Sequence, residues 1–330
     1  MSQNSRVAVL FPGQGAQYVG MGKDLYERCP ESREVFEGAN RILGSDLLRL
    51  MLEGPEETLT RTANSQPAIF VMSYAAWVAL KARAERSRGP LCPRWSQPEA
   101  FAGLSLGEYT ALVAAGAFSF EDGLRIVCKR GRYMEEACEA RPGTMASVIG
   151  LTMSQVRDVC DVARARGIVD VANANSPGQI VVSGEREAVQ EACRLAKEHG
   201  AKAVIPLNVS GAFHSGLMKE AERRLAAELT QMDVSVPRVP VIANVTGREE
   251  SEPREIIANL ARQVTGSVLF QQSIELLLGR GVNTFVEVGC GKVLQGLVKR
   301  INPQTVRMGV EDMPSLEATL DALEEGQKER

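Results

Sequence analysis

The sequence predicts an α/β protein in which a parallel-sheet domain is split by an inserted ferredoxin-like subdomain. Short apolar runs with strand character alternate with helical patterns at both ends of the chain, an alternation typical of parallel sheets. Between residues 141 and 207 the predicted order changes to β-α-β-β-α-β, the split pattern of a ferredoxin-like unit. We therefore expect a large domain made of residues 1–140 and 208–330, with residues 141–207 as the insertion.

The large domain is expected to begin with a buried strand over residues 6–11, which the turn Pro12-Gly13-Gln14-Gly15 ends. A mostly buried helix is predicted over 67–82, with Pro67 in its first turn, where the missing N–H is tolerated. An S-x-x-D pattern at Ser119 predicts the start of a further helix. The other elements predicted before the insertion are a surface loop at 86–98, a strand at 100–105 and helices at 106–115 and 119–138.

The insertion is predicted from strand-like and helical patterns that follow one another closely. Its strands are expected at 143–151, 168–175, 179–184 and 201–209, and its helices at 152–167 and 185–200. The alternation then resumes, with strands at 239–245 and 284–289 and helices at 254–280 and 291–300. The acidic tail at 311–330 contains one amphipathic helical turn and then becomes polar.

Composition excludes several classes of protein. A formal charge of −3 gives no reason to expect a nucleic-acid binder. No apolar run is long enough for a membrane helix, and the N-terminus lacks the pattern of a secretion signal. The seven cysteines are odd in number and form no C-x-x-C pair, which argues against a disulfide framework and a zinc site. We expect a reduced, cytoplasmic protein without a bound metal.

Ser105 is the first candidate for chemistry, because it stands in a G-x-S-x-G pattern between Gly103 and Gly107. A nucleophile elbow needs a strand before the serine, a helix after it and small neighbours that let the turn close. All of these are predicted here. The alternative is a plain strand–helix turn whose glycines serve packing only.

A serine hydroxyl needs a base, and the chain has only two histidines. His199 is expected at a helix C-terminus followed by Gly200, where a structural role is favoured. His214 follows a predicted strand and precedes a helix, at the end of the sheet where α/β proteins place their sites. The adjacent helix N-terminus disfavours the imidazolium form, so His214 is the candidate base. A helix-flanking histidine bonded to the backbone is the alternative.

The turn at 12–15 does not match a phosphate-binding loop, because neither a G-x-G-x-x-G nor a Walker pattern is present. A glycine-flanked turn at the carboxyl end of a strand can instead direct a backbone N–H at a developing oxyanion. We expect the amide of Gln14 to act in this way, with the amide of Leu106 as the second donor.

Arg130 is the candidate cation. On the helix predicted over 119–138 it falls at the edge of the apolar stripe, whereas Lys129 and Arg132 face solvent. A guanidinium at that edge must find an anion or reach water along the surface. Geometry alone favours the second, a surface arginine whose stem covers the stripe.

Several segments together resemble one known family. FPGQGAQYVGMG, NSQPAIF, GLSLGEYTALVAAG, KRGRYMEEA, ANANSPGQIVVSG, GAFHSGLMKEA and EVGCGKVL occur in the order found in malonyl-CoA:acyl carrier protein transacylases. The acyltransferase domains of polyketide synthases are related to these enzymes. The resemblance extends from about residue 6 to about residue 310.

The resemblance implies a hydrolase-like large domain and a site without metal or prosthetic group, acting on malonyl-CoA and acyl carrier protein. Ser105 would be the acylated nucleophile and His214 the base, with Gln14 and Leu106 as oxyanion donors. Arg130 would bind the malonyl carboxylate. The remaining implied site residues are Gln263, whose backbone carbonyl would support the histidine, and Gln66 nearby. We expect a monomer that binds neither nucleic acid nor membrane.

The chain departs from the family pattern at Leu104, where a histidine usually stands, and in the loop at 86–98, which is longer than usual. The change at Leu104 removes a polar group beside the nucleophile. Phe213 resembles malonyl-selective members, in which the ring would fill the space that an α-methyl branch needs. A basic patch for an acidic carrier protein is expected from Lys299, Arg300 and the arginines at 83, 86 and 88.

Three alternatives remain open from the sequence: an acyl hydrolase on the same scaffold, a polyketide-pathway transferase, and a non-catalytic docking protein. The elbow does not separate the first from a transferase, although Arg130 favours malonyl transfer. The presence of Ser105, His214, Gln14 and Arg130 argues against the third.

Overall fold

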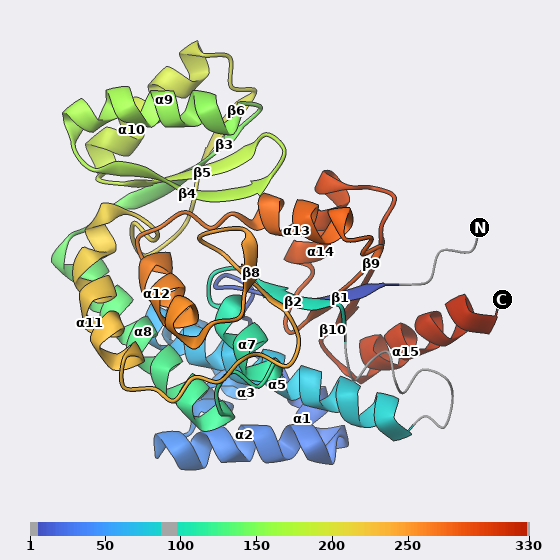
Figure 1. The fold of residues 1–330 in the computed structure, drawn as a ribbon. Helices are drawn as coiled ribbons and strands as arrows, with labels where there is room; N and C mark the ends of the chain where they lie inside the picture. The colour runs from blue at the N-terminus through green and yellow to red at the C-terminus, as the bar shows by residue number, and fades with distance from the viewer. Residues whose placement is uncertain (1–5, 87–97, 329–330) are drawn as a thin grey trace.

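A computed structural model describes residues 6–86 and 98–328 of the chain (Figure 1). The loop predicted at 86–98 therefore lies almost entirely outside the described residues. The large domain contains a 6-stranded sheet in the order β10-β9-β1-β2-β7-β8. Neighbouring strands are parallel except for the edge pair β7 and β8. The strands are β1 (Val7–Phe11), β2 (Ala100–Gly103), β7 (Val241–Ala243), β8 (Arg248–Glu250), β9 (Thr284–Val288) and β10 (Val306–Val310).

Alternation along the strands sends side chains to two different cores. Val9 and Phe11 of β1 belong to the larger core, which includes side chains of α5 (Thr62–Arg86) and α8 (Phe120–Ala140). Ala8 and Leu10 face the opposite side, where α13 (Phe270–Gly279) and α14 (Val293–Ile301) complete a smaller core. Each face of the sheet is therefore buried by helices, as expected of a parallel α/β sheet. The helices before the insertion are α1 (Lys23–Arg28), α2 (Pro30–Leu43), α3 (Leu47–Glu53), α4 (Glu56–Thr60), α5 (Thr62–Arg86), α7 (Gly107–Ala114) and α8 (Phe120–Ala140).

The insertion forms a second, antiparallel sheet with the strand order β4-β5-β3-β6, drawn above the large domain in Figure 1. Its two α-helices share one apolar core with the strands. The elements follow each other as β-α-β-β-α-β, so the predicted fold class is confirmed. They are β3 (Thr144–Ile149), α9 (Met153–Ala163), η1 (Arg164–Arg166), β4 (Val169–Ser176), β5 (Gln179–Gly184), α10 (Arg186–Glu198) and β6 (Ala203–Pro206).

The part of the chain after the insertion contains the largest error of the sequence analysis. The helix expected over 254–280 is two helices, because residues 264–269 leave the helical path. Within this break, Val268 donates its N–H to the carbonyl of Ala172 and accepts from the N–H of Ala174, so it extends the edge of β4. Tertiary pairing with the other domain overrides the local helical pattern. The helices here are η2 (Gly216–Met218), α11 (Lys219–Leu229), α12 (Pro253–Gln263), α13 (Phe270–Gly279), α14 (Val293–Ile301) and α15 (Met313–Lys328).

Two further predictions were wrong in detail, and two strands were missed. Helix α5 begins at Thr62, so Pro67 lies inside the helix rather than in its first turn. Strands β8 and β10 were not predicted, and both lie at sheet edges, where few apolar residues mark a short strand. The tail contains the helix α15, whose Leu316 and Leu323 are buried. The predicted cap at Ser119 is confirmed, since its side chain accepts from the N–H of Asp122.

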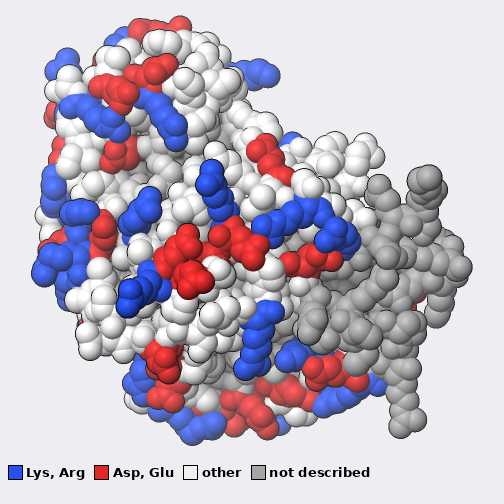
Figure 2. All heavy atoms as spheres, viewed as in Figure 1, with Lys and Arg blue, Asp and Glu red and all other residues white. Residues whose placement is uncertain are grey.

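Charges of both signs lie on one face of the molecule. On the face drawn in Figure 2, basic and acidic side chains are interspersed. Of the residues expected to form a basic patch, Arg86 is paired with Glu31 and Arg300 donates to Gln179, while position 88 lies outside the described residues. No helix within 6–86 or 98–328 is long and apolar enough to cross a membrane.

Candidate active site

Ser105 lies on a sharp turn between strand β2 and helix α7. Its φ is 52°, in the left-handed region that residues with a side chain rarely adopt. The turn closes because its flanking glycines allow backbone to approach backbone. A Cβ on Gly103 would lie 2.1 Å from the carbonyl carbon of Gly107, and one on Gly107 would lie 2.1 Å from the oxygen of Phe11. The geometry is that of a nucleophile elbow.

His214 is the other described non-glycine residue with a positive φ, at 58°. Strained backbone of this kind costs about 1–3 kcal/mol and gathers at functional sites. The two strained residues meet: Oγ of Ser105 lies 2.8 Å from Nε2 of His214. His199, by contrast, lies exposed at the end of α10 and contacts the carbonyl of Leu195 through Nδ1.

The tautomer of His214 follows from its second partner. Nδ1 lies 2.7 Å from the backbone oxygen of Gln263, which can only accept. This carbonyl is available because α12 ends at Gln263. Nδ1 therefore carries the hydrogen, and the lone pair of Nε2 faces the serine. Burial, and then the charge of Arg130, lowers the pKa of His214 to about 4, so the imidazole is neutral near pH 7.

Arg130 is buried, with 1% of its surface exposed, so the prediction of a surface arginine was wrong. Its helix α8 packs against α5, and the edge of the apolar stripe faces the site rather than water. Nη1 donates to Oε1 of Gln66 at 2.6 Å. Nη2 donates to Oε1 of Gln263 at 3.0 Å and to Oγ of Ser105 at 2.9 Å. All of these acceptors are neutral, and Arg130 forms no ion pair with any described residue.

The two contacts of the serine hydroxyl fix the direction of its hydrogen bonds. A guanidinium only donates, so Oγ of Ser105 accepts from Arg130. The hydroxyl hydrogen is then free to point at the lone pair of Nε2 of His214. This arrangement prepares the transfer of the serine proton to His214.

The backbone amide of Gln14 lies in the turn that follows β1, and the backbone amide of Leu106 directly follows Ser105 in the elbow. Within the described residues, neither amide donates a hydrogen bond to another group. Leu106 precedes the first residue of α7, where helical amides lack intrahelical partners. The side chain of Gln14 accepts a long hydrogen bond, 3.4 Å, from Nε2 of Gln66. Gln66 also accepts from Arg130, so Gln14 lies close to the group that holds the arginine.

A cavity of about 290 Å³ opens onto Ser105, His214, Arg130 and Gln14. It lies between the two domains, since Met145, Asn173, Asn175 and Val181 of the small sheet also line it. Its apolar wall is formed by Leu104, Met134, Met145, Val181, Leu207 and Phe213. The volume is close to the lower end of the range for small-molecule pockets in proteins.

Sequence reasoning missed four polar residues of this region. Asn173 and Asn175 are two positions apart on β4, so both side chains are expected on the same face of the strand. This spacing was the signal that could have placed both in the cavity. Asn244 accepts from the N–H of Ser105 through Oδ1 at 2.6 Å, and Glu108 accepts from Gln263. Nothing in the local pattern marks the last two, because both are buried within apolar segments.

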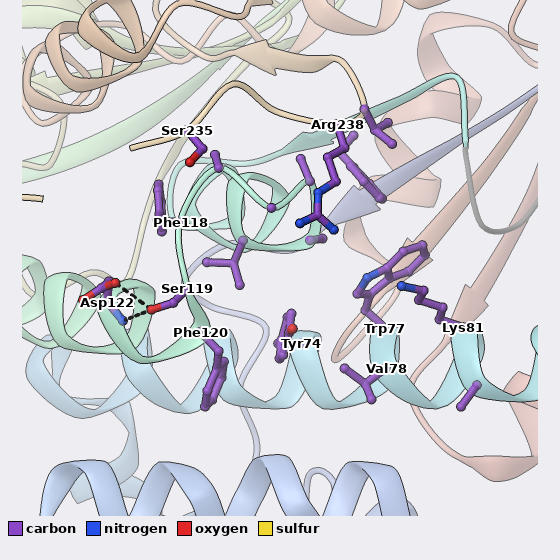
Figure 3. Close-up of a pocket in the computed structure, with 18 of the residues that line it drawn as sticks. Tyr74, Trp77, Val78, Lys81, Phe118, Ser119, Phe120, Asp122, Ser235 and Arg238 are labelled. Atoms are coloured by element: carbon purple, nitrogen blue, oxygen red, sulfur yellow. Dashed lines mark hydrogen bonds between the residues drawn. The ribbon is translucent and has the colours of Figure 1, made fainter. Parts of the chain in front are cut away.

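A larger cavity of about 800 Å³ lies at the other end of α7, between α5, α8 and residues 233–239. Figure 3 shows Trp77, Tyr74, Lys81 and Arg238 around it. Its described lining contains no histidine or cysteine, and Ser119 is turned toward Asp122 as a helix cap. This cavity lacks a base beside a nucleophile, so the smaller one is the candidate active site.

Comparison with known proteins decides the family. The acyl transferase domain family matches residues 9–318. The malonyl CoA-acyl carrier protein transacylase of Bacillus subtilis is 43% identical over 322 residues, which are 97% of this chain and 98% of that protein. The chain belongs to the malonyl CoA-acyl carrier protein transacylase family.

Solved structures of this family superpose closely. The transacylase of Clostridium perfringens has a TM-score of 0.90 at 41% identity, with 98% of each chain covered. A malonyl-transacylase in complex with a type II polyketide synthase acyl-carrier protein has a TM-score of 0.88 at 38% identity, covering 96% of this chain and 100% of that one. Membership of the transacylase family confirms the predicted enzyme class, an acyltransferase.

Proposed function

We propose that the protein transfers a malonyl group from malonyl-CoA to the thiol of acyl carrier protein through a malonyl ester on Ser105. The relatives named above are malonyl CoA-acyl carrier protein transacylases, and one of them forms a complex with a carrier protein. The observation that carries the proposal is the position of the Ser105 hydroxyl between a neutral histidine and a buried arginine.

In the first half-reaction, Nε2 of His214 takes the hydroxyl proton while Oγ of Ser105 attacks the thioester carbon of malonyl-CoA. The resulting oxyanion accepts from the free amides of Gln14 and Leu106, and each such donor is worth about 10²–10³ in rate. When the carbonyl re-forms, the C–S bond breaks and the CoA sulfur takes the proton from His214. The product is malonyl-Ser105 and CoA.

In the second half-reaction the carrier's phosphopantetheine thiol occupies the place that CoA has left. His214 accepts the thiol proton, and sulfur attacks the ester carbon. Collapse of the oxyanion releases Oγ, which recovers its proton from His214. The same residues serve both half-reactions, and the acyl-enzyme intermediate between them predicts ping-pong kinetics. Nucleophile, base and oxyanion donors all come from the chain, so the proposed reaction calls for no metal or prosthetic group.

Arg130 explains why the site accepts a charged acyl group. A carboxylate that enters a buried cavity needs a fixed cation, and the guanidinium provides parallel donors. Two carboxamide oxygens, from Gln66 and Gln263, hold Arg130 in place without neutralising it. Its charge is therefore available to the malonyl carboxylate, while Leu104 and Phe213 limit the space beside the acyl chain.

We also propose that the enzyme is monomeric, that it is located in the cytoplasm, and that it serves fatty-acid synthesis. The described cysteines, all free thiols, fit a reducing compartment. An acyl hydrolase is the chemical alternative, since water could take the place of the carrier thiol.

One assay tests the function. The protein is mixed with malonyl-, methylmalonyl- or acetyl-CoA, with and without a carrier protein, and both acyl-carrier and free acid are measured. We expect malonyl-carrier to be the dominant product. Free malonate in excess of malonyl-carrier would assign a hydrolase, and equal use of acetyl-CoA would remove the role of Arg130. Comparing fatty-acid and polyketide carriers decides between the pathways.

A further inference from the structure

Glu108 is a buried carboxylate that the proposed reaction does not use. It lies on the first turn of α7 and has no exposed surface. Its Oε2 accepts from the backbone N–H of Asn244 at 2.8 Å and from Nε2 of Gln263 at 2.9 Å. A single oxygen therefore receives two donors that belong to the surroundings of the nucleophile.

Gln263, one of the two donors to Glu108, has several contacts in the site. The carboxamide of Gln263 donates to Glu108 and to the backbone oxygen of Ser105, and its Oε1 accepts from Arg130. Its backbone oxygen contacts Nδ1 of His214. If the carboxamide were reversed, its NH₂ would face the guanidinium, and two donors would oppose each other. The acceptors on Glu108 and on the Ser105 backbone together fix the orientation that leaves an oxygen for Arg130, and of these two only the acceptor on Glu108 belongs to a side chain.

Asn244, the other donor to Glu108, holds the backbone of the elbow through hydrogen bonds. Asn244 accepts from the N–H of Ser105 at 2.6 Å and donates to the oxygen of Gly103 at 2.8 Å. Glu108 itself donates its backbone N–H to the oxygen of Ser105. The carboxyl group thus links the supports of Arg130 and of Ser105.

We propose that Glu108 is a positioning residue for malonyl recognition: its Oε2 orients the Gln263 carboxamide, which in turn holds Arg130 for the substrate carboxylate. The inference rests on the proposed function. What matters is an acceptor at this distance, because the carbonyl oxygen of a protonated acid also receives both donors. Burial raises the pKa of Glu108 to about 7, and the orientation of Gln263 persists in either state.

Two conservative variants separate the effect of the position of the side-chain oxygen from the effect of its charge. Glu108→Gln keeps an oxygen at the same distance and removes the charge, whereas Glu108→Asp keeps the charge and withdraws the oxygen by one methylene. We expect Glu108→Gln to retain the malonyl-CoA kcat/KM within about threefold. Glu108→Asp should raise the KM for malonyl-CoA by about 10-fold to 100-fold, the effect of one lost hydrogen bond to a charged group. Acetyl transfer should change much less, because acetyl carries no carboxylate for Arg130.

Glu250 supplies the matched control. It is also a buried carboxylate, and burial, followed by the charge of nearby Glu108, raises its pKa. Its hydrogen-bond donor, however, is Asn259, which lies outside the site. Glu250→Gln and Glu250→Asp should leave the ratio of malonyl to acetyl transfer unchanged. A role of Glu108 in stability alone would lower thermal midpoints and both activities together, without changing that ratio.

The outcomes are distinct. A wild-type ratio in folded Glu108→Asp, or a Gln variant as impaired as the Asp variant, overturns the inference. Should Glu108→Asp fail to fold, Gln263→Met removes the same link while keeping the backbone carbonyl. Unchanged malonyl KM in that variant has the same meaning. Failure of the wild-type protein to transfer malonyl would instead refute the proposed function.

Discussion

The hydroxyl oxygen of Ser105 and Nε2 of His214 lie 2.8 Å apart although 109 positions separate them in the chain. The serine is carried by the elbow after β2 and the histidine by the segment that returns from the small subdomain. Both have left-handed backbones, and Arg130 touches the same hydroxyl from a third element. This meeting of three elements underlies the predictions below.

Replacing the base should stop acylation. In His214→Ala no group takes the proton of Ser105, so the rate of malonyl-enzyme formation should fall by at least about 10²–10⁴. Intact-mass measurement after incubation with malonyl-CoA provides the readout. His199→Ala, which alters the exposed histidine, is the control and should label normally. Normal labelling of the His214 variant would remove this residue from the mechanism.

The pH dependence should be that of a depressed base. Because the pKa of His214 is lowered to about 4, kcat/KM for malonyl-CoA should be constant around pH 7 and fall only below about pH 5, as the imidazole becomes protonated. Burial is the main cause and the charge of Arg130 the next. Removing that cation in Arg130→Ala should therefore move the inflection to higher pH. A wild-type inflection above pH 6.5, the ordinary value for histidine, would contradict the neutral-base assignment.

Arg130→Ala should change the substrate preference. Malonyl-CoA loses its charged partner, so its kcat/KM should fall by about 10²-fold, whereas acetyl transfer should fall far less. Steady-state kinetics with both thioesters measure the ratio. Arg132→Ala, on the exposed side of the same helix, is the matched control. Equal losses with the two substrates would show that Arg130 does not recognise the carboxylate.

Phe213 should limit substrate size. Its ring lines the cavity and is 7% exposed, so Phe213→Ala opens space next to the acyl group. We expect the ratio of methylmalonyl to malonyl transfer to rise by about tenfold, the effect of accommodating one methyl group. Competition between the two thioesters for one carrier measures this ratio directly. An unchanged ratio would place the size limit elsewhere.

The elbow should tolerate no side chain at Gly107. A Cβ there would lie 2.1 Å from the oxygen of Phe11, so Gly107→Ala must displace backbone and should destabilise the protein by more than about 3 kcal/mol. Gly296→Ala in α14, where nothing lies within 4 Å of the new methyl, should instead stabilise by about 1 kcal/mol. Denaturant unfolding compares the two. Equal stability of both variants would contradict the close approach at the elbow.

Local chemistry made part of this site predictable. The glycines around Ser105 and the turn at 12–15 are short-range requirements, and the two histidines left few candidates for the base. Burial of Arg130 depends on Gln66 and Gln263, which lie 64 and 133 positions away, so a helical wheel could not show it. The break after α12 has the same cause, since its hydrogen bonds come from β4. Glu108 and Asn244 acquire their partners only when the sheet assembles.

Peptide mapping of the protein after brief exposure to malonyl-CoA tests the central assignment most directly. We expect one malonyl group on the peptide that contains Ser105, its release by a carrier-protein thiol, and no labelling of Ser105→Ala. Malonyl found on another residue, or undiminished transfer by Ser105→Ala, would contradict the account.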